Sequence, residues 1–155
     1  MTAGAAPPIP AGFEAFEMGG PFMAVNGPLF KRRRGGEFAL GLRIEPRHVN
    51  PMANLHGGMM ASFCDMLLVL VAHHQSETLR AHFMPTVSLQ LDYLAPAPLG
   101  CWIEGGGQLL RTTRSLAFVQ ALVTADGQPC VRASGVLKIG PLIDEVVARG
   151  RAPSS

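Results

Sequence analysis

The chain has 155 residues, of which 48% are hydrophobic and 15% charged, and its formal net charge at pH 7 is +2. This balance excludes an intrinsically disordered chain, and so small a net charge argues against a nucleic-acid-binding protein. The length predicts a single domain over residues 1–155, with mobile ends at 1–12 and 148–155.

The elements before residue 56 are short. We predict one or two turns of helix over 12–18, then a hairpin with strands at 29–33 and 38–45 and a turn at 34–37. The second strand is predicted because Phe38, Leu40, Leu42 and Ile44 alternate with other residues. Residues 46–55, with two prolines and two asparagines, are expected to be irregular.

One long helix is predicted from Gly57 to about Gln75. It is apolar on nearly all sides, so we expect protein to surround it. Four strands follow at 86–94, 101–111, 115–124 and 130–139, with Asp126-Gly127 as a tight turn, and one helical turn after Pro141. This order predicts an α+β protein in which a curved antiparallel sheet of about six strands wraps around one central helix, while a partner chain covers the remaining faces.

Cysteine usage and apolar stretches bear on the cellular compartment. Cys64, Cys101 and Cys130 are an odd number without the spacing of metal ligands, which favours a reducing, cytoplasmic location. Residues 1–12 lack the basic and apolar regions of a secretory signal. The most apolar stretch, 59–72, is shorter than the ~20 residues of a membrane span and contains Asp65. We therefore expect no membrane partner.

Two glycines, Gly57 and Gly58, begin the long helix after His56. The first N–H groups of a helix have no partner inside it, and glycine leaves them accessible. Together with the positive end of the helix dipole they favour a developing oxyanion. The alternative is that the glycines only let the backbone turn tightly or pass close to a strand.

Asp65 lies among apolar residues, where a carboxylate is costly unless it is paired. It is a candidate general base or nucleophile, or else a structural aspartate satisfied by a strand or a partner chain. Gly57 and Asp65 are separated by ~12 Å along a helix, too far for one chain to apply both to one reacting group. Two antiparallel copies of the helix bring Gly57 of one beside Asp65 of the other, so a catalytic site here requires a homodimer.

Several motifs keep their order and spacing along the chain: Asn-x5-His-Gly-Gly-x6-Asp at 50–65, Thr-Val-Ser-Leu-x-Leu-x-Tyr-Leu-x-Pro-Ala at 86–97, Arg-Ser-Leu-Ala-Phe-Val at 114–119 and Asp-Gly at 126–127. Over residues 28–140 they resemble the hotdog-fold acyl-CoA thioesterases of the 4-hydroxybenzoyl-CoA thioesterase-like superfamily, nearest its phenylacetate-pathway branch. The resemblance implies a hotdog fold, hydrolysis of an acyl-CoA, a homodimer or homotetramer, and no cofactor apart from the coenzyme A of the substrate.

The resemblance also assigns roles to residues. Asp65 would activate water or attack the thioester carbonyl, and the N–H of Gly57 from the opposite subunit would polarise that carbonyl. Asn50 would position substrate or water, His56 would shape the same loop, and Thr86 would orient the attacking water. Thr86 is equally well an ordinary β-branched strand residue.

Coenzyme A carries phosphates, so cations are expected near it. The resemblance places the nucleotide at the turn formed by Arg111, Thr112, Thr113, Arg114 and Ser115, with Lys138 as a further candidate. The alternative for each cation is a solvated surface charge. The basic run 31–34 would help in the same way or protect a sheet edge. The remaining residues expected to contact substrate are Gly58, Ser88 and Tyr93.

The chain departs from the family at two positions. Ala53 stands where the family usually has glycine, so alanine is strained there if that position needs a positive φ. Thr112 and Thr113 replace a turn that often carries glycine, so the nucleotide contacts are expected to differ.

Other functions remain open on sequence alone. A non-catalytic acyl-CoA-binding protein has the same features, whereas a hotdog dehydratase or hydratase needs a His-x-Phe-Pro-x-x-Pro-Gly loop that the sequence lacks. We expect no metal, because the adjacent His73 and His74 point about 100° apart on a helix. Cys64 is not expected to be a nucleophile, since Asp65 beside it raises its pKa. Aromatic and medium-chain acyl groups fit the sequence equally well.

Overall fold

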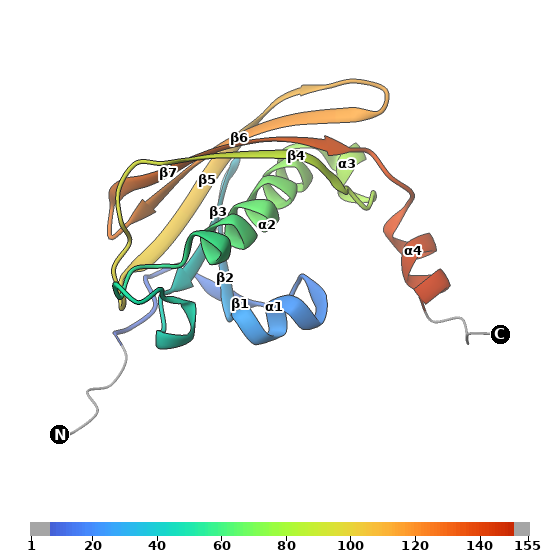
Figure 1. Cartoon of the computed structure of the whole chain (residues 1–155). Helices are drawn as coiled ribbons and strands as arrows, with labels where there is room; N and C mark the ends of the chain where they lie inside the picture. Colours follow the sequence, from blue (N-terminus) through green and yellow to red (C-terminus); the bar gives the residue numbers. More distant parts are fainter. Residues whose placement is uncertain (1–6, 151–155) are drawn as a thin grey trace.

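The computed structural model describes residues 7–150 and shows one sheet curved around a long helix (Figure 1). The helices are α1 (Gly20–Asn26), the 3-10 turn η1 (Pro46–His48), α2 (Gly57–Gln75), α3 (Glu77–Arg80) and α4 (Ile143–Gly150). The strands are β1 (Glu14–Phe16), β2 (Leu29–Arg34), β3 (Glu37–Arg43), β4 (Thr86–Tyr93), β5 (Trp102–Thr112), β6 (Leu116–Ala125) and β7 (Gln128–Lys138). The predicted α+β architecture is confirmed.

The sheet has seven strands in the order β1-β2-β3-β5-β6-β7-β4, and all neighbours are antiparallel. Strand β4 pairs with β7 and forms one edge of the sheet. Figure 1 shows that this strand runs alongside α2. The turn between β6 and β7 has Asp126 at φ 46° and Gly127 at φ 87°, the backbone that a two-residue hairpin of this hand requires.

Two glycines let α2 lie close against the sheet. A Cβ at Gly105 would meet Leu67 at 2.4 Å, and one at Gly135 would meet Leu68 at 2.7 Å. These contacts also fix the orientation of the strands: residues 105 and 135 face the helix, so residues 104 and 134 face outward.

The sheet covers only part of α2, and one side of the helix stays partly open in the protomer. Ten of its residues are buried, but the stripe of Ala61, Ser62, Asp65, Met66 and Val69 is only half-buried. By length and composition α2 is apolar enough to cross a membrane, yet 56% of that window is buried inside the protein, as in a core helix. The stripe that carries Asp65 is the part of α2 left for a partner.

The segment before β2 differs from expectation in two ways. Residues 14–16 form β1 against β2 rather than a helix, which accounts for the seventh strand. A helix, α1, follows, and sequence reasoning missed it although Pro21 after Gly19-Gly20 is typical of a helix start. Of the predicted mobile ends, 1–6 and 151–155 lie outside the described residues. Pro8 lies against β3, where its carbonyl accepts a hydrogen bond from Arg43.

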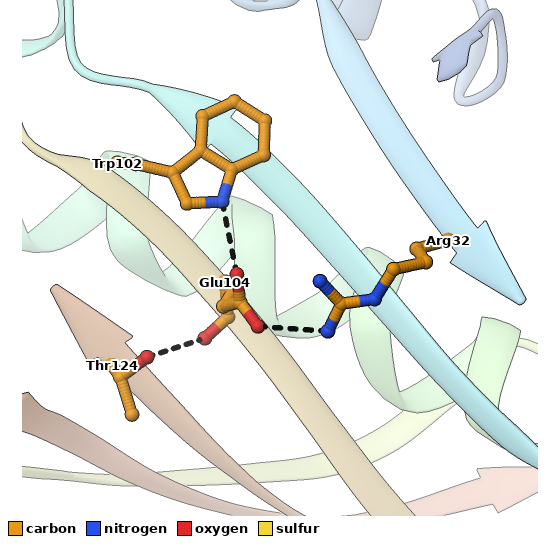
Figure 2. A network of polar contacts seen from close by, with 4 residues as sticks. All are labelled: Arg32, Trp102, Glu104 and Thr124. Carbon is orange, nitrogen blue, oxygen red and sulfur yellow. Dashed lines mark hydrogen bonds and ion pairs between the residues drawn. The ribbon is translucent and has the colours of Figure 1, made fainter. Parts of the chain in front are cut away.

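The outer face of the sheet carries a polar network made by Arg32, Trp102, Glu104 and Thr124 (Figure 2). Glu104 accepts hydrogen bonds from Arg32 at 3.1 Å and from the indole N–H of Trp102 at 3.2 Å, and its backbone oxygen accepts one from Thr124 at 3.4 Å. Phe13 packs edge-on against Trp102, with ring centroids 5.0 Å apart. The segment before β1 therefore covers β2, β3 and β5 on the side away from α2.

Candidate active site

The predicted catalytic carboxylate, Asp65, lies on the half-buried stripe of α2 and has one side-chain partner. Thr86 Oγ1 donates a hydrogen bond of 2.6 Å to Asp65 Oδ1. Within residues 7–150, no lysine or arginine forms an ion pair with Asp65. The second carboxylate oxygen is therefore available to a ligand or a water molecule.

Thr86 reaches Asp65 because of its place in the sheet. It begins β4 and pairs with Leu137, which is fully buried on the helix side. A register irregularity between Thr86 and Ser88 follows immediately. Ser88 pairs with Val136 and, like it, faces the outer side of the sheet. Ser88, predicted to contact substrate, thus points away from Asp65.

Asp65 lines two hollows in the surface. The α2 pocket, of about 520 Å³, is bounded by Asp65, Met66, Val69 and His73 of α2, by residues 83–86, by residues 18–20 and by Ile143. The α1 pocket, of about 370 Å³, lies on the other side and is lined by Phe22, Ser62 and Leu89 among others. A reacting group bound at Asp65 would have space on both sides.

The start of α2 is held by its neighbours. His56 Nδ1 accepts a hydrogen bond of 3.0 Å from the N–H of Gly58, so His56 caps the helix. Gly58 was predicted to contact substrate, and in this fold its N–H is bonded to His56. The N–H of Gly57 is the first of the helix and has no carbonyl one turn before it within the helix.

Tyr93 fixes the same turn from β4. Its hydroxyl donates a hydrogen bond of 2.6 Å to the carbonyl oxygen of Gly57. Partial burial raises the pKa of Tyr93, so its hydroxyl remains protonated and able to donate. Tyr93, predicted to contact substrate, is thus placed to hold the residue whose N–H is the candidate oxyanion donor.

Asn50 organises the loop before α2. Its Oδ1 accepts the N–H of Met52 at 2.9 Å and of Asn54 at 3.2 Å, so the side chain holds its own loop together. Ala53 in this loop has φ 56°, the left-handed backbone that glycine adopts without strain. The strain predicted for alanine at this position is therefore present.

The helix geometry separates the candidate acid from the candidate oxyanion donor. Gly57 and Asp65 are two helical turns apart, ~12 Å along the axis. Both lie on the side of α2 that the protomer leaves partly uncovered. A single protomer therefore does not bring the two groups to one point.

The segment predicted to bind the nucleotide is an exposed turn at the end of the sheet where β4 begins. Thr113 Oγ1 accepts the N–H of Leu116 at 3.1 Å and closes the turn. The side chains of Arg111, Thr112, Arg114 and Ser115 are exposed, as is Lys138 on the neighbouring strand. In the described part of the chain none of these three cations forms an ion pair.

Other reactive side chains near Asp65 are unsuited to nucleophilic chemistry. Burial, with the nearby Cys130 and Asp65, raises the pKa of Cys64 to about 12, so its thiol is protonated at neutral pH. His73 is buried, and burial lowers its pKa. Residues 7–150 contain no group of three or more His, Cys, Asp or Glu side chains placed to hold a metal.

Sequence reasoning missed the contribution of α1 to this site. Gly19 borders both pockets, and Phe22 lines the α1 pocket together with a smaller hollow of about 280 Å³ at His56 and Gly58. The signal was the Gly-Gly-Pro start of α1, which marks a helix but says nothing of where that helix packs.

Comparison with known proteins gives a consistent family. A family model described as the thioesterase superfamily matches residues 52–131. A protein of Pseudomonas aeruginosa named "Putative esterase" is 27% identical over 132 residues, which are 84% of this chain and 97% of that protein.

Two solved structures share the fold. A hypothetical thioesterase protein from Streptococcus pneumoniae, solved with coenzyme A, has a TM-score of 0.65 at 17% identity, and the match covers 74% of this chain and 87% of that chain. A variant of the phenylacetic acid degradation protein PaaI from Thermus thermophilus has a TM-score of 0.61 at 22% identity, and the match covers 76% of this chain and 97% of that chain. The hotdog fold and the resemblance seen in the sequence motifs are confirmed.

Proposed function

The chain belongs to the thioesterase superfamily, and on that premise we propose that it hydrolyses the thioester bond of an acyl-CoA with Asp65 as the catalytic carboxylate. The observation that carries the proposal is the Asp65–Thr86 pair, in which Thr86 holds one carboxylate oxygen of a residue that borders two pockets. A carboxylate without a cationic partner is able to take a proton from water.

The reaction consumes one water and one thioester and gives a carboxylic acid and the thiol of coenzyme A. Asp65 acts in one of two ways. As a general base it removes a proton from water as the water oxygen attacks the carbonyl carbon. As a nucleophile it attacks the carbonyl carbon itself, releasing the thiolate and forming an anhydride that water then opens. In both routes the carbonyl oxygen becomes an oxyanion that needs a donor.

We propose that this donor is the Gly57 N–H of the partner subunit in a homodimer. Within one protomer the two groups are ~12 Å apart along α2 and cannot reach one carbonyl. An antiparallel pairing of two α2 stripes brings each Gly57 opposite the other copy's Asp65, giving two equivalent sites. Two observations support this arrangement: the stripe on α2 is half-buried, and hydrogen bonds from His56 and Tyr93 hold the first turn of the helix.

The substrate is proposed to carry coenzyme A because unpaired cations lie near the site. Arg111, Arg114 and Lys138 are at the end of the sheet where Thr86 begins β4: Ser115 O accepts the Ile139 N–H, and Pro85 O accepts the Lys138 N–H. The phosphates of the nucleotide are the ligands that such cations favour. The acyl group is proposed to be aromatic or medium-chain, and two dimers to associate as a homotetramer.

The test is thiol release from a panel of acyl-CoAs of several chain lengths and an aromatic one. We expect wild-type turnover on at least one, and Asp65→Asn to lower kcat at least about 100-fold, because the amide cannot take the proton. Asp92→Asn is the matched control, since Asp92 faces outward in an exposed ion pair with Arg132. Tight acyl-CoA binding without turnover would overturn the proposal in favour of a binding protein.

A further inference from the structure

Two cross-links join α2 to the segment that leads into β4. At one end Thr86 donates to Asp65. At the other end His73 Nε2 lies 3.0 Å from the carbonyl oxygen of His82; since a carbonyl oxygen only accepts, Nε2 carries the proton. The segment 82–86 therefore runs alongside α2 in the opposite direction, and the α2 pocket lies between the two cross-links.

The length of this space follows from the backbone on both sides. Asp65 and His73 are eight residues apart, ~12 Å along a helix. Residues 82 and 86 are four residues apart, roughly 13 Å when extended. With bonds of ~1.5 Å and angles of ~111°, an extended hydrocarbon advances roughly 1.3 Å per carbon, so about eight to ten carbons span the pocket.

The walls between the two ends are apolar. Met66 and Val69 of α2 line the pocket, and the other apolar side chains along it are those of Met18, Phe83, Met84, Pro85 and Ile143. Methionine side chains adapt their shape to an apolar ligand. At the far end the imidazole of His73 is already hydrogen-bonded, and burial lowers its pKa, so this end is uncharged at neutral pH.

Resting on the proposed thioesterase function, we propose that the α2 pocket receives the acyl chain of the substrate, that the His73–His82 cross-link ends it, and that Val69 is a specificity-determining residue halfway along. The preferred substrate is then a medium-chain acyl-CoA of about eight to ten carbons. The pantetheine arm, with two amides, is disfavoured here because the wall between the two cross-links offers methionine, valine and isoleucine side chains.

The experiment is the ratio of kcat/KM for decanoyl-CoA to that for butyryl-CoA. Val69→Phe fills the middle of the pocket, so this ratio is expected to fall at least about tenfold, since several methylenes lose their burial. Val25→Phe is the matched control: Val25 lies on α1, is 68% exposed and does not line the pocket, so the ratio stays at the wild-type value. A second variant, Val69→Ala, widens the pocket and is expected to raise the ratio of branched to linear decanoyl substrates.

If Val69→Phe lowers kcat/KM by the same factor for all chain lengths, the proposal is overturned. That result would mean that the pantetheine arm, which all the substrates share, occupies this pocket. Unchanged ratios in both variants would overturn it as well. Calorimetry separates this failure from failure of the proposed function. The affinities of the Asp65→Asn protein for decanoyl-CoA and for butyryl-CoA can be measured without turnover. Adding Val69→Phe to this protein is expected to lower its affinity for decanoyl-CoA relative to its affinity for butyryl-CoA.

Discussion

Thr86 Oγ1 lies 2.6 Å from Asp65 Oδ1 and joins the edge strand of the sheet to the central helix across 21 positions of sequence. The contact orients the carboxylate, because the Thr86 O–H donates to one of its two oxygens. A side chain that holds the acid in this way affects the rate more than the binding of substrate.

Thr86→Val removes the donor but keeps the shape of the side chain. We expect kcat to fall roughly 10- to 100-fold with little change in KM, whereas Thr86→Ser, which keeps the hydroxyl, stays within a few-fold of wild type. Steady-state kinetics on the best acyl-CoA of the panel measures both. Equal loss in the valine and serine variants would contradict a specific role for the hydroxyl, because serine keeps that group.

Tyr93→Phe removes the hydrogen bond to the Gly57 carbonyl. The bond contributes about 1 kcal/mol to folding, so Tm is expected to fall by about 2–4 °C. Because Gly57 is the proposed oxyanion donor, kcat is expected to fall roughly tenfold as well. Calorimetric melting and kinetics on the same preparation test both effects. A lower Tm with unchanged kcat would assign Tyr93 a purely structural role.

Ala53→Gly is expected to stabilise the protein. Alanine at φ 56° carries left-handed strain that glycine avoids, and after the entropy cost of glycine about 0.5–1 kcal/mol remains. The corresponding rise in Tm is about 1–4 °C. Ala24→Gly, in the right-handed backbone of α1, is the control and is expected to lower Tm.

Ala61→Arg tests the homodimer. If Gly57 of one copy faces Asp65 of the other in antiparallel helices, the two-fold axis passes midway, at Ala61, and the variant places two guanidinium groups together. We expect a monomer by light scattering and loss of more than about 99% of activity, since neither site is complete. Ala15→Arg is the control, because Ala15 lies on β1, at the edge of the sheet opposite β4. This variant is expected to change neither the oligomeric state nor the activity.

The stability of the fold is expected to decrease in mild acid. Burial lowers the pKa of His48 and of His73 from their ordinary 6.5, so below about pH 6.5 the unfolded chain binds protons that the folded chain does not. The free energy of unfolding therefore falls as pH decreases from 7 to 5, and these groups have no effect above about pH 7.5. Urea unfolding at several pH values measures the slope, and His48→Gln is expected to reduce it.

The central helix and the later strands were predictable because their apolar patterns are long. The predicted helix at 57–75 has the bounds of α2, and the four later strands differ from β4 to β7 by one or two residues. Residues 12–18 were assigned to a helix because Phe13 and Phe16 suit one face of a helix. In the fold Phe13 packs on Trp102 and residues 14–16 pair with β2, a tertiary contact that no local pattern reveals.

The sequence indicated candidate residues for the site but not the contacts that these residues make. The sequence placed Asp65 on the helix, and its link to Thr86 required only the family resemblance. That His56 would occupy the Gly58 N–H, that Asn50 would bind its own loop and that Ser88 would face outward depend on side-chain directions and on one strand irregularity. Spacing along the sequence does not encode these.

The Phe13–Trp102 contact limits how protomers can stack. Pro8 and Phe13 already lie over β3 and β5, so the outer surface of the sheet is divided into a part the chain shields itself and a part left bare. The bare part includes Leu122 on β6, which is 45% exposed. Any back-to-back assembly of dimers through this surface must therefore use the part over β4, β6 and β7, unless the amino-terminal segment first moves away.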